Sequence, residues 1–71
     1  MFNSKLLKLF EKETSKKISF KKDFNENNLD SLDMITIVNI IEDEYGIEIT
    51  EKEIKKIKNF KNLFSTVEKK K

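Results

Sequence analysis

Apolar side chains recur with a helical period at the start of the chain. Phe2, Leu6, Leu9 and Phe10 fall at positions i, i+4, i+7 and i+8, with lysines between them. This spacing puts the four side chains on one face of an amphipathic helix. Asn3 or Ser4 can cap its N-terminus, because short polar side chains accept hydrogen bonds from first-turn N–H groups. The pattern predicts a first helix.

The next stretch, residues 13–30, has no sustained period. Its apolar side chains are scattered through polar sequence, at Ile18, Phe20, Phe24 and Leu29. We interpret this stretch as a long loop that those four side chains hold against the core. Loops of this length are unusual in small domains and are often functional.

Residues 31–45 are apolar almost all round. The β-branched run 35–38 also suits a strand, but the length of the stretch and its ends favour a helix. Asp30 or Ser31 can cap the start, and Asp33 stands in the first turn, where the helix dipole favours a carboxylate. Gly46, the single glycine, stands where such a helix would end.

The last third of the sequence predicts two more helices. Thr50 and Glu53 have the spacing of a capping box and precede a short apolar segment. Asn59 can cap a final helix with one apolar stripe, formed by Phe60, Leu63, Phe64 and Val67. Lys69–Lys71 should fray. The chain is thus predicted to be a single all-α domain over residues 1–71, a small four-helix bundle with three longer helices, one short helix and a long loop between helices 1 and 2.

Composition removes several kinds of chemistry. The 71 residues include no Cys and no His, so the chain has no thiol nucleophile, no imidazole base and no Cys/His metal site. We therefore expect a non-enzymatic protein. We also expect a cytoplasmic one, because the absence of cysteine suits a reducing compartment and no segment has the pattern of a membrane span or a signal peptide.

The net charge of +2 conceals a strong segregation of charge. Residues 1–22 hold seven Lys and two Glu, and residues 52–71 hold eight Lys and two Glu. Residues 23–51, by contrast, hold nine acidic residues and no Lys. On a surface that only confers solubility, positive and negative side chains are interspersed. The acidic centre therefore indicates a functional surface.

Two other motifs do not indicate a metal site or an active site. Asp23–Asn27 matches the opening of an EF-hand calcium loop, but Asn28 replaces the glycine at the sixth position and Met34 the glutamate at the twelfth. The acidic triplet Glu42-Asp43-Glu44 is interpreted as a solvated helix face, because no second domain forms a cleft around it.

A longer pattern points to a family. The run Asp30-Ser31-Leu32-Asp33, an apolar helix, the triplet at 42–44, Tyr45 and then Ile47-Glu48-Ile49 together resemble acyl carrier proteins. The resemblance implies that Ser31 carries 4′-phosphopantetheine, transferred from coenzyme A, whose thiol bears acyl groups as thioesters. A hydroxyl at a helix N-terminus suits this, because unpaired N–H groups and the dipole favour a phosphodiester, although an ordinary N-cap serine would stand there as well.

The same resemblance assigns the surface around Ser31. It implies that partner enzymes contact Asp30, Leu32, Asp33, Ile35, Glu42, Asp43 and Glu48. It also implies a set of side chains that line the core or an acyl pocket, namely Met34, Ile37, Val38, Ile41 and Tyr45. The partners would be a phosphopantetheinyl transferase and the acyl- or aminoacyl-loading and acyl-processing enzymes. We expect a monomer that binds neither nucleic acid nor membrane.

The sequence departs from the family at several positions. Asn27 and Asn28 stand where a glycine usually precedes the serine motif, Thr36 replaces a glutamate of the docking helix, and Asn39 replaces an apolar contact. Fatty-acid or related synthesis is therefore one reading of the cargo, and a dedicated aminoacyl, D-alanyl or specialised-pathway carrier is another. An unmodified adaptor and a Lys-rich nucleic-acid-binding protein are more distant alternatives. We predict that the Lys-rich ends lie away from the docking face.

Overall fold

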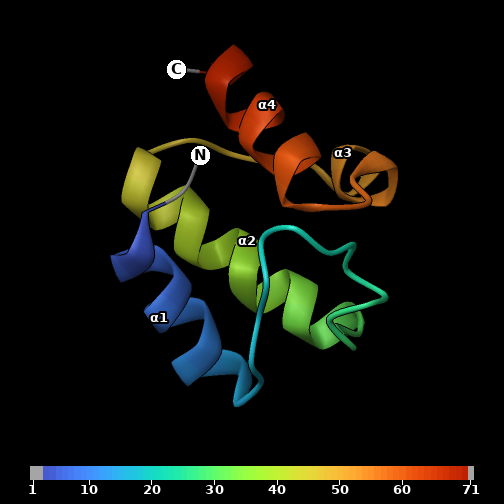
Figure 1. Ribbon diagram of the computed structural model, residues 1–71. Helices are drawn as coiled ribbons and strands as arrows, with labels where there is room; N and C mark the ends of the chain where they lie inside the picture. The colour runs from blue at the N-terminus through green and yellow to red at the C-terminus, as the bar shows by residue number, and fades with distance from the viewer. Residues whose placement is uncertain (1–2, 71) are drawn as a thin grey trace.

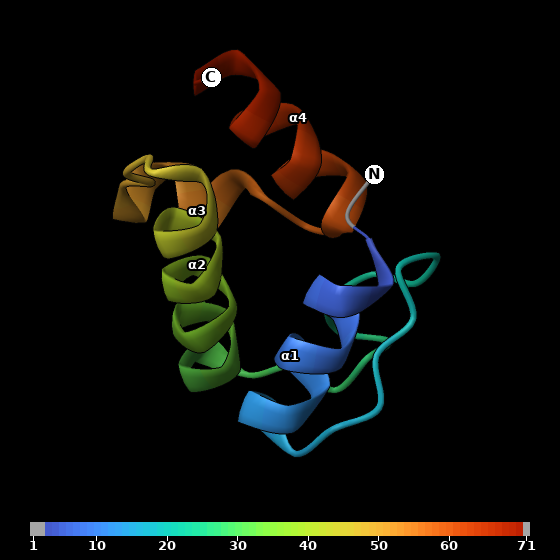
Figure 2. The ribbon, with the colours of Figure 1, turned by 90° about the vertical axis from the view of Figure 1, so that its left-hand side faces the viewer.

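Four helices make up the regular structure of residues 3–70, the part of the chain that the computed structural model describes. They are α1 (Ser4–Thr14), α2 (Ser31–Tyr45), α3 (Glu51–Lys56) and α4 (Phe60–Lys70) (Figure 1). Helices α1 and α2 pack against each other, and α4 lies across one end of this pair (Figure 2). The prediction of an all-α fold with three longer helices and one short helix is confirmed.

Side-chain caps explain where the helices begin. The Asn3 side chain accepts a hydrogen bond from the Leu6 N–H at 2.9 Å, and Asp30 and Thr50 each open a capping box. Before α4, the Asn59 Oδ1 accepts from the Asn62 N–H at 2.8 Å. Each cap satisfies an N–H group that the first turn of a helix leaves without a partner.

Helix α2 ends at Gly46, which has a positive φ of 64°. The Gly46 N–H donates to the Glu42 carbonyl at 2.9 Å. A residue with a Cβ would be strained in this left-handed conformation, so the single glycine of the chain stands where the backbone requires it.

The core joins all three longer helices. Its fully buried side chains are Phe10 from α1, Ile37 and Ile41 from α2, and Phe60, Leu63 and Val67 from α4. Phe60 is the hub of an aromatic cluster, with its ring centroid 6.0 Å from Phe10, 4.9 Å from Phe20 and 5.0 Å from Phe24. Offset or edge-on aromatic pairs of this kind each contribute roughly 0.5–1.5 kcal/mol beyond their buried area.

The predicted long loop of residues 13–30 begins at residue 15, because Glu13 and Thr14 still belong to α1. The core holds the segment 15–30 down. From the end of α1 it runs along the bundle to α4 and then returns to the start of α2 (Figures 1 and 2). Ile18, Phe24 and Leu29 are buried and Phe20 is half-buried. The Phe24 N–H donates to the Lys58 carbonyl at 3.0 Å, which fastens the loop to the segment between α3 and α4.

The buried amide of Asn27 organises the inside of this loop. Its Nδ2 donates to the carbonyls of Ser19, Lys22 and Asp23 at 3.0, 3.2 and 3.1 Å. Its Oδ1 accepts from the Ser19 N–H at 2.7 Å. One side chain thus replaces the backbone hydrogen bonds that a helix or strand would have provided.

Two details differ from the sequence-based expectations. Leu9 is 38% exposed, because the core face of α1 follows Leu6, Phe10 and Thr14 at intervals of four residues; Phe2 lies outside the described residues. Thr14 is tolerated there because its hydroxyl donates to the Phe10 carbonyl at 2.7 Å.

The fraying of Lys69–Lys71 stays a prediction. Helix α4 continues to Lys70, whose Nζ lies 2.9 Å from the Glu53 Oε1. This ion pair gives the last turn a contact with α3. Lys71 lies outside the described residues.

Candidate functional site

The start of α2 leaves the Ser31 hydroxyl free. Asp30 is the N-cap: its Oδ1 accepts from the Asp33 N–H at 2.9 Å, and the Asp33 Oδ2 accepts from the Asp30 N–H at 3.2 Å. Ser31 is therefore the first residue of the helix and is not its cap. Its side chain is exposed, and neither its hydroxyl nor its N–H makes a hydrogen bond within residues 3–70.

A lysine from the far side of the loop fixes this turn. The Lys16 Nζ donates to the Asp33 Oδ2 and to the Asn28 carbonyl, at 2.6 Å for the carbonyl. The hydrogen bond from Lys16, followed by that from the Asp30 N–H, holds the pKa of the Asp33 carboxyl below its usual range. The same bond raises the pKa of the Lys16 amine. Asp33 therefore stays ionised and serves the local structure.

Asn28 lies in the stretch before the serine motif where the resemblance leads one to expect a glycine. Its φ is 59°, in the left-handed region. Asparagine adopts this conformation more readily than most residues with a side chain. The departure from the family pattern is thus explained by the backbone, since Asn28 makes the turn that a glycine would make.

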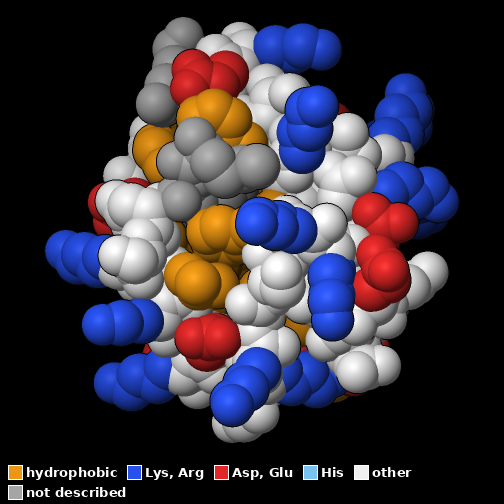
Figure 3. Space-filling model, viewed as in Figure 1, with side chains coloured by type: hydrophobic (Ala, Val, Ile, Leu, Met, Phe, Trp, Pro, Cys, Tyr) orange, Lys and Arg blue, Asp and Glu red, His pale blue; other side chains and the backbone are white. Residues whose placement is uncertain are grey.

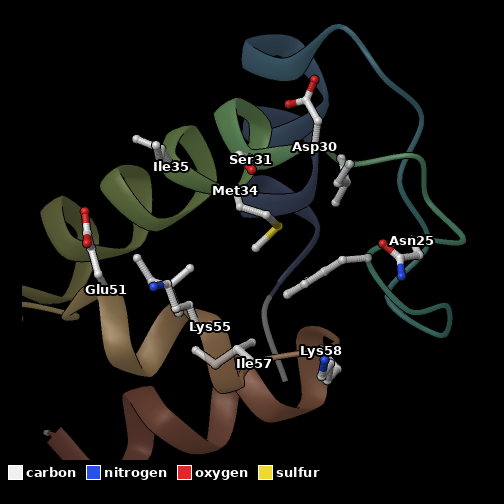
Figure 4. A pocket seen from close by; sticks show the side chains of 12 residues that line it. Asn25, Asp30, Ser31, Met34, Ile35, Glu51, Lys55, Ile57 and Lys58 are labelled. Carbon is white, nitrogen blue, oxygen red and sulfur yellow. The ribbon is translucent and has the colours of Figure 1, made fainter.

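A groove of about 490 Å³ opens beside Ser31 (Figure 4). Ser31 and Met34 approach it from α2, and Glu51 and Lys55 from α3. The apolar side chains that line it are Phe24, Leu29, Met34, Ile35, Ile54 and Ile57. The polar and charged ones are Asn25, Asp30, Ser31, Glu51, Lys55 and Lys58. An apolar groove with a few polar groups is typical of a ligand site.

The apolar residues predicted for partner docking are exposed next to Ser31. Leu32 is 74% exposed and Ile35 is 50% exposed. Exposed large apolar side chains that lie next to one another are a feature of interaction surfaces more than of solvated helix faces.

The predicted docking acids fall into two groups along α2. Asp30 and Asp33 stand at its start, and the other three, Glu42, Asp43 and Glu48, stand at and after its end. Between Asp33 and Glu42 the helix has no charged residue. Glu42 has a structural task as well, because its Oε2 accepts the Ile49 N–H at 2.7 Å. Asp43 and Glu48 are exposed.

The residues assigned to the core or to an acyl pocket divide between the two. Ile37, Val38 and Ile41 are buried in the core, and Tyr45 is half-buried against it. Met34 alone of the five lines the groove beside Ser31.

The basic residues do not keep to the far side of the molecule, so that prediction is wrong. Lys16 binds the first turn of α2, and Lys55 and Lys58 line the groove that Ser31 lines. Lysines also stand around much of the face in Figure 3, with apolar side chains exposed near its middle. Segregation along the sequence does not persist in space, because the loop and α3 fold back against α2.

Within residues 3–70, no group of three or more acidic side chains comes together in a way that could hold a metal ion. None of the helices in that range is long and apolar enough to cross a membrane.

Comparisons with known proteins agree with this geometry. Residues 4–67 match the family described as "Phosphopantetheine attachment site". The crystal structure of an acyl carrier protein from Thermotoga maritima superposes with a TM-score of 0.80 and 31% sequence identity. The match covers 94% of this chain and 82% of that one. No curated protein sequence matches. The chain belongs to the acyl carrier protein family, whose members bear phosphopantetheine, and it is a carrier and not an enzyme.

Proposed function

We propose that Ser31 is the residue to which 4′-phosphopantetheine is attached, and that the thiol of this group carries acyl intermediates between biosynthetic enzymes. The observation that carries the proposal is the division of labour at the start of α2. Asp30 caps the helix, so the Ser31 hydroxyl is exposed and has no structural task. The terminal thiol of the group supplies the thioester chemistry that this cysteine-free chain lacks.

The role of the chain itself is presentation. Ser31 stands on the first turn of a helix whose start is fixed by the Asp30–Asp33 capping box and by Lys16. The hydroxyl has no basic side chain bonded to it, so the transferase must supply the base that removes its proton. A rigid, exposed hydroxyl is what such an enzyme needs from its substrate, because ordering a mobile segment would weaken binding.

Intact mass tests the attachment. The protein is incubated with coenzyme A and a broad-specificity phosphopantetheinyl transferase, and we expect a gain of one phosphopantetheine group. Ser31→Ala should abolish the gain. Ser4→Ala is the matched control, because Ser4 is likewise the first residue of a helix, behind the Asn3 cap. No gain in the wild type, or a gain that persists in Ser31→Ala, would contradict the proposal.

We further propose that the cargo belongs to fatty-acid or related biosynthesis. The support is the apolar groove beside Ser31, which suits an aliphatic acyl chain. A dedicated aminoacyl or D-alanyl carrier is the second candidate, favoured by the uncharged Thr36 and Asn39 on α2. The mass of the protein isolated with its cargo from its native host distinguishes a fatty-acyl group from an aminoacyl group. The cytoplasmic location stays an expectation from the sequence.

A partner surface follows from the same proposal. Leu32 and Ile35 would enter an apolar depression of the transferase or of an acyl-processing enzyme, and Asp30, Asp43 and Glu48 would face its basic residues. Asp33 and Glu42 would contribute less, since each already binds within the chain. Separate Leu32→Ser and Asp43→Asn variants in the transferase assay test this, with Glu68→Gln on α4 as the distant control.

A further inference from the structure

We propose that Lys55 and Lys58 form an anion site beside Ser31, which holds the phosphodiester of the attached group in the modified protein. The inference rests on the proposed attachment at Ser31. It adds a role for two residues of this chain that neither the capping of α2 nor the partner surface explains.

The three residues line one groove. Ser31 lines it from the start of α2, Lys55 from α3 and Lys58 from the segment that follows α3 (Figure 4). A lysine amine stands at the end of a flexible stem of four methylene groups, so its position can adapt to an anion formed in the same groove. A phosphodiester formed on the Ser31 oxygen would stand at that rim in every modified molecule.

Both amines are available. Within residues 3–70, the Nζ atoms of Lys55 and Lys58 make no hydrogen bond and no ion pair, and both residues are exposed. Two other lysines are already engaged, because Lys16 binds Asp33 and Lys70 binds Glu53. The two lysines that line the groove are among those without a carboxylate partner in the described residues, and their place on the groove sets them apart from the rest.

Modification of Ser31 would place negative charges close together, and the amines of Lys55 and Lys58 can offset their repulsion. Modification adds one negative charge next to Asp30, whose carboxylate is already there as the cap. Lys16 pairs with Asp33 and also attracts Asp30, whereas Lys55 and Lys58 are the lysines of the described residues that line the groove with Ser31. The phosphodiester and Asp30 carry like charges that repel, and these two lysines would offset the repulsion.

Glu51 is the one competing carboxylate on α3 that lines the groove. It stands four residues before Lys55, a spacing at which Glu and Lys attract across one helical turn. No ion pair within 4.0 Å joins the two in the described residues. The phosphodiester, which is fixed at the mouth of the groove once formed, would thus find Lys55 unpaired.

Thermal unfolding of the unmodified and modified protein tests the site. The modified form is prepared with a free thiol, so that a cargo carboxylate cannot contribute. At low ionic strength we expect modification to raise the Tm of the wild type by roughly 2–5 °C. The double variant Lys55→Gln/Lys58→Gln should lose most of this rise. Lys52→Gln/Lys61→Gln, which removes two exposed lysines that do not line the groove, should keep it.

Two further readouts sharpen the result. Glu51→Gln removes the competitor and should enlarge the rise, and 0.5 M salt should reduce it. The ³¹P resonance of the phosphodiester should move in each single variant, Lys55→Gln and Lys58→Gln, but not in Lys61→Gln. Equal Tm rises in the two double variants, no rise in the wild type, or an unmoved ³¹P resonance would overturn the site. Failure of the attachment itself is distinct, because it leaves no mass gain at all.

Discussion

The Lys16 Nζ and the Asp33 Oδ2, seventeen residues apart in the sequence, lie 2.5 Å apart in the structure. The same amine binds the carbonyl of Asn28. One lysine at the start of the long loop therefore binds both Asn28 at the end of that loop and Asp33 in the first turn of α2, and Ser31 stands between these two residues. The position of the candidate attachment site depends on a contact formed only when the loop has closed.

Lys16→Gln should lower the Tm by roughly 1–5 °C, because it removes a charged contact on a partly shielded carboxylate. It should also accelerate amide hydrogen exchange around residues 28–33. Lys17→Gln is the matched control, since Lys17 is an exposed neighbour whose side chain makes no such contact within residues 3–70. Equal Tm values for the two variants would show that the contact does not stabilise the loop.

The ionisation of Asp33 should make the stability of the protein depend on pH. Its pKa is lowered in the folded state, so the stabilisation is complete above the ordinary carboxyl pKa of about 3.9 and is lost as the pH falls through the lowered value. The raised pKa of Lys16 keeps the contact intact until the pH passes above about 10.4. The difference in Tm between the wild type and Asp33→Asn should be constant between about pH 4 and about pH 10 and should shrink toward zero below about pH 4. A constant difference down to pH 2 would contradict this.

Asn27→Ala should be among the most destabilising polar substitutions in the chain. It removes the hydrogen bonds to the carbonyls of Ser19, Lys22 and Asp23 and leaves the Ser19 N–H without its acceptor. We expect a loss of about 2–4 kcal/mol in the free energy of unfolding, measured with urea. Asn25→Ala, whose side chain is exposed, should change it by less than about 0.5 kcal/mol. Similar losses for both variants would refute the role of the Asn27 amide.

The left-handed backbone at Asn28 predicts a clear ranking. Asn28→Val should cost about 1–2 kcal/mol, because a β-branched side chain is strained at a φ of 59°. Asn28→Gly should stay within about 0.5 kcal/mol of the wild type, as relief of strain and added chain entropy in the unfolded state oppose each other. Urea unfolding of both variants checks the order. A valine variant as stable as the glycine variant would show that this turn is not needed.

The helices were predictable because their signals are local. Caps at Asn3, Asp30, Thr50 and Asn59 lie within three residues of the N–H groups that they satisfy, and Gly46 marks the end of α2. The assignment of helix to the β-branched run 35–38 also depended on such end signals. The family pattern around Ser31 was readable for the same reason.

The contacts that shape the site were not predictable, because they join distant positions. Nothing in the sequence distinguishes Lys16 from Lys17, or Asn27 from Asn25, until the loop has folded. The position of Lys55 and Lys58 on the groove depends likewise on how α3 meets α2. The charge pattern gave a wrong prediction for this reason. It indicated that the Lys-rich ends lie away from the docking face, whereas Lys16 binds the first turn of α2 and Lys55 and Lys58 line the groove beside Ser31.

The aromatic cluster around Phe60 has a consequence for how the protein resists proteolysis. The loop contains four lysines, at 16, 17, 21 and 22, and would be an easy substrate for trypsin if it could detach. Phe20 and Phe24 tie it to a ring that is itself fully buried between α1 and α4. Lifting the loop would open the core, so cleavage there should follow the rate of global unfolding. We therefore expect the lysine-rich loop to resist trypsin as long as the four-helix bundle stays folded.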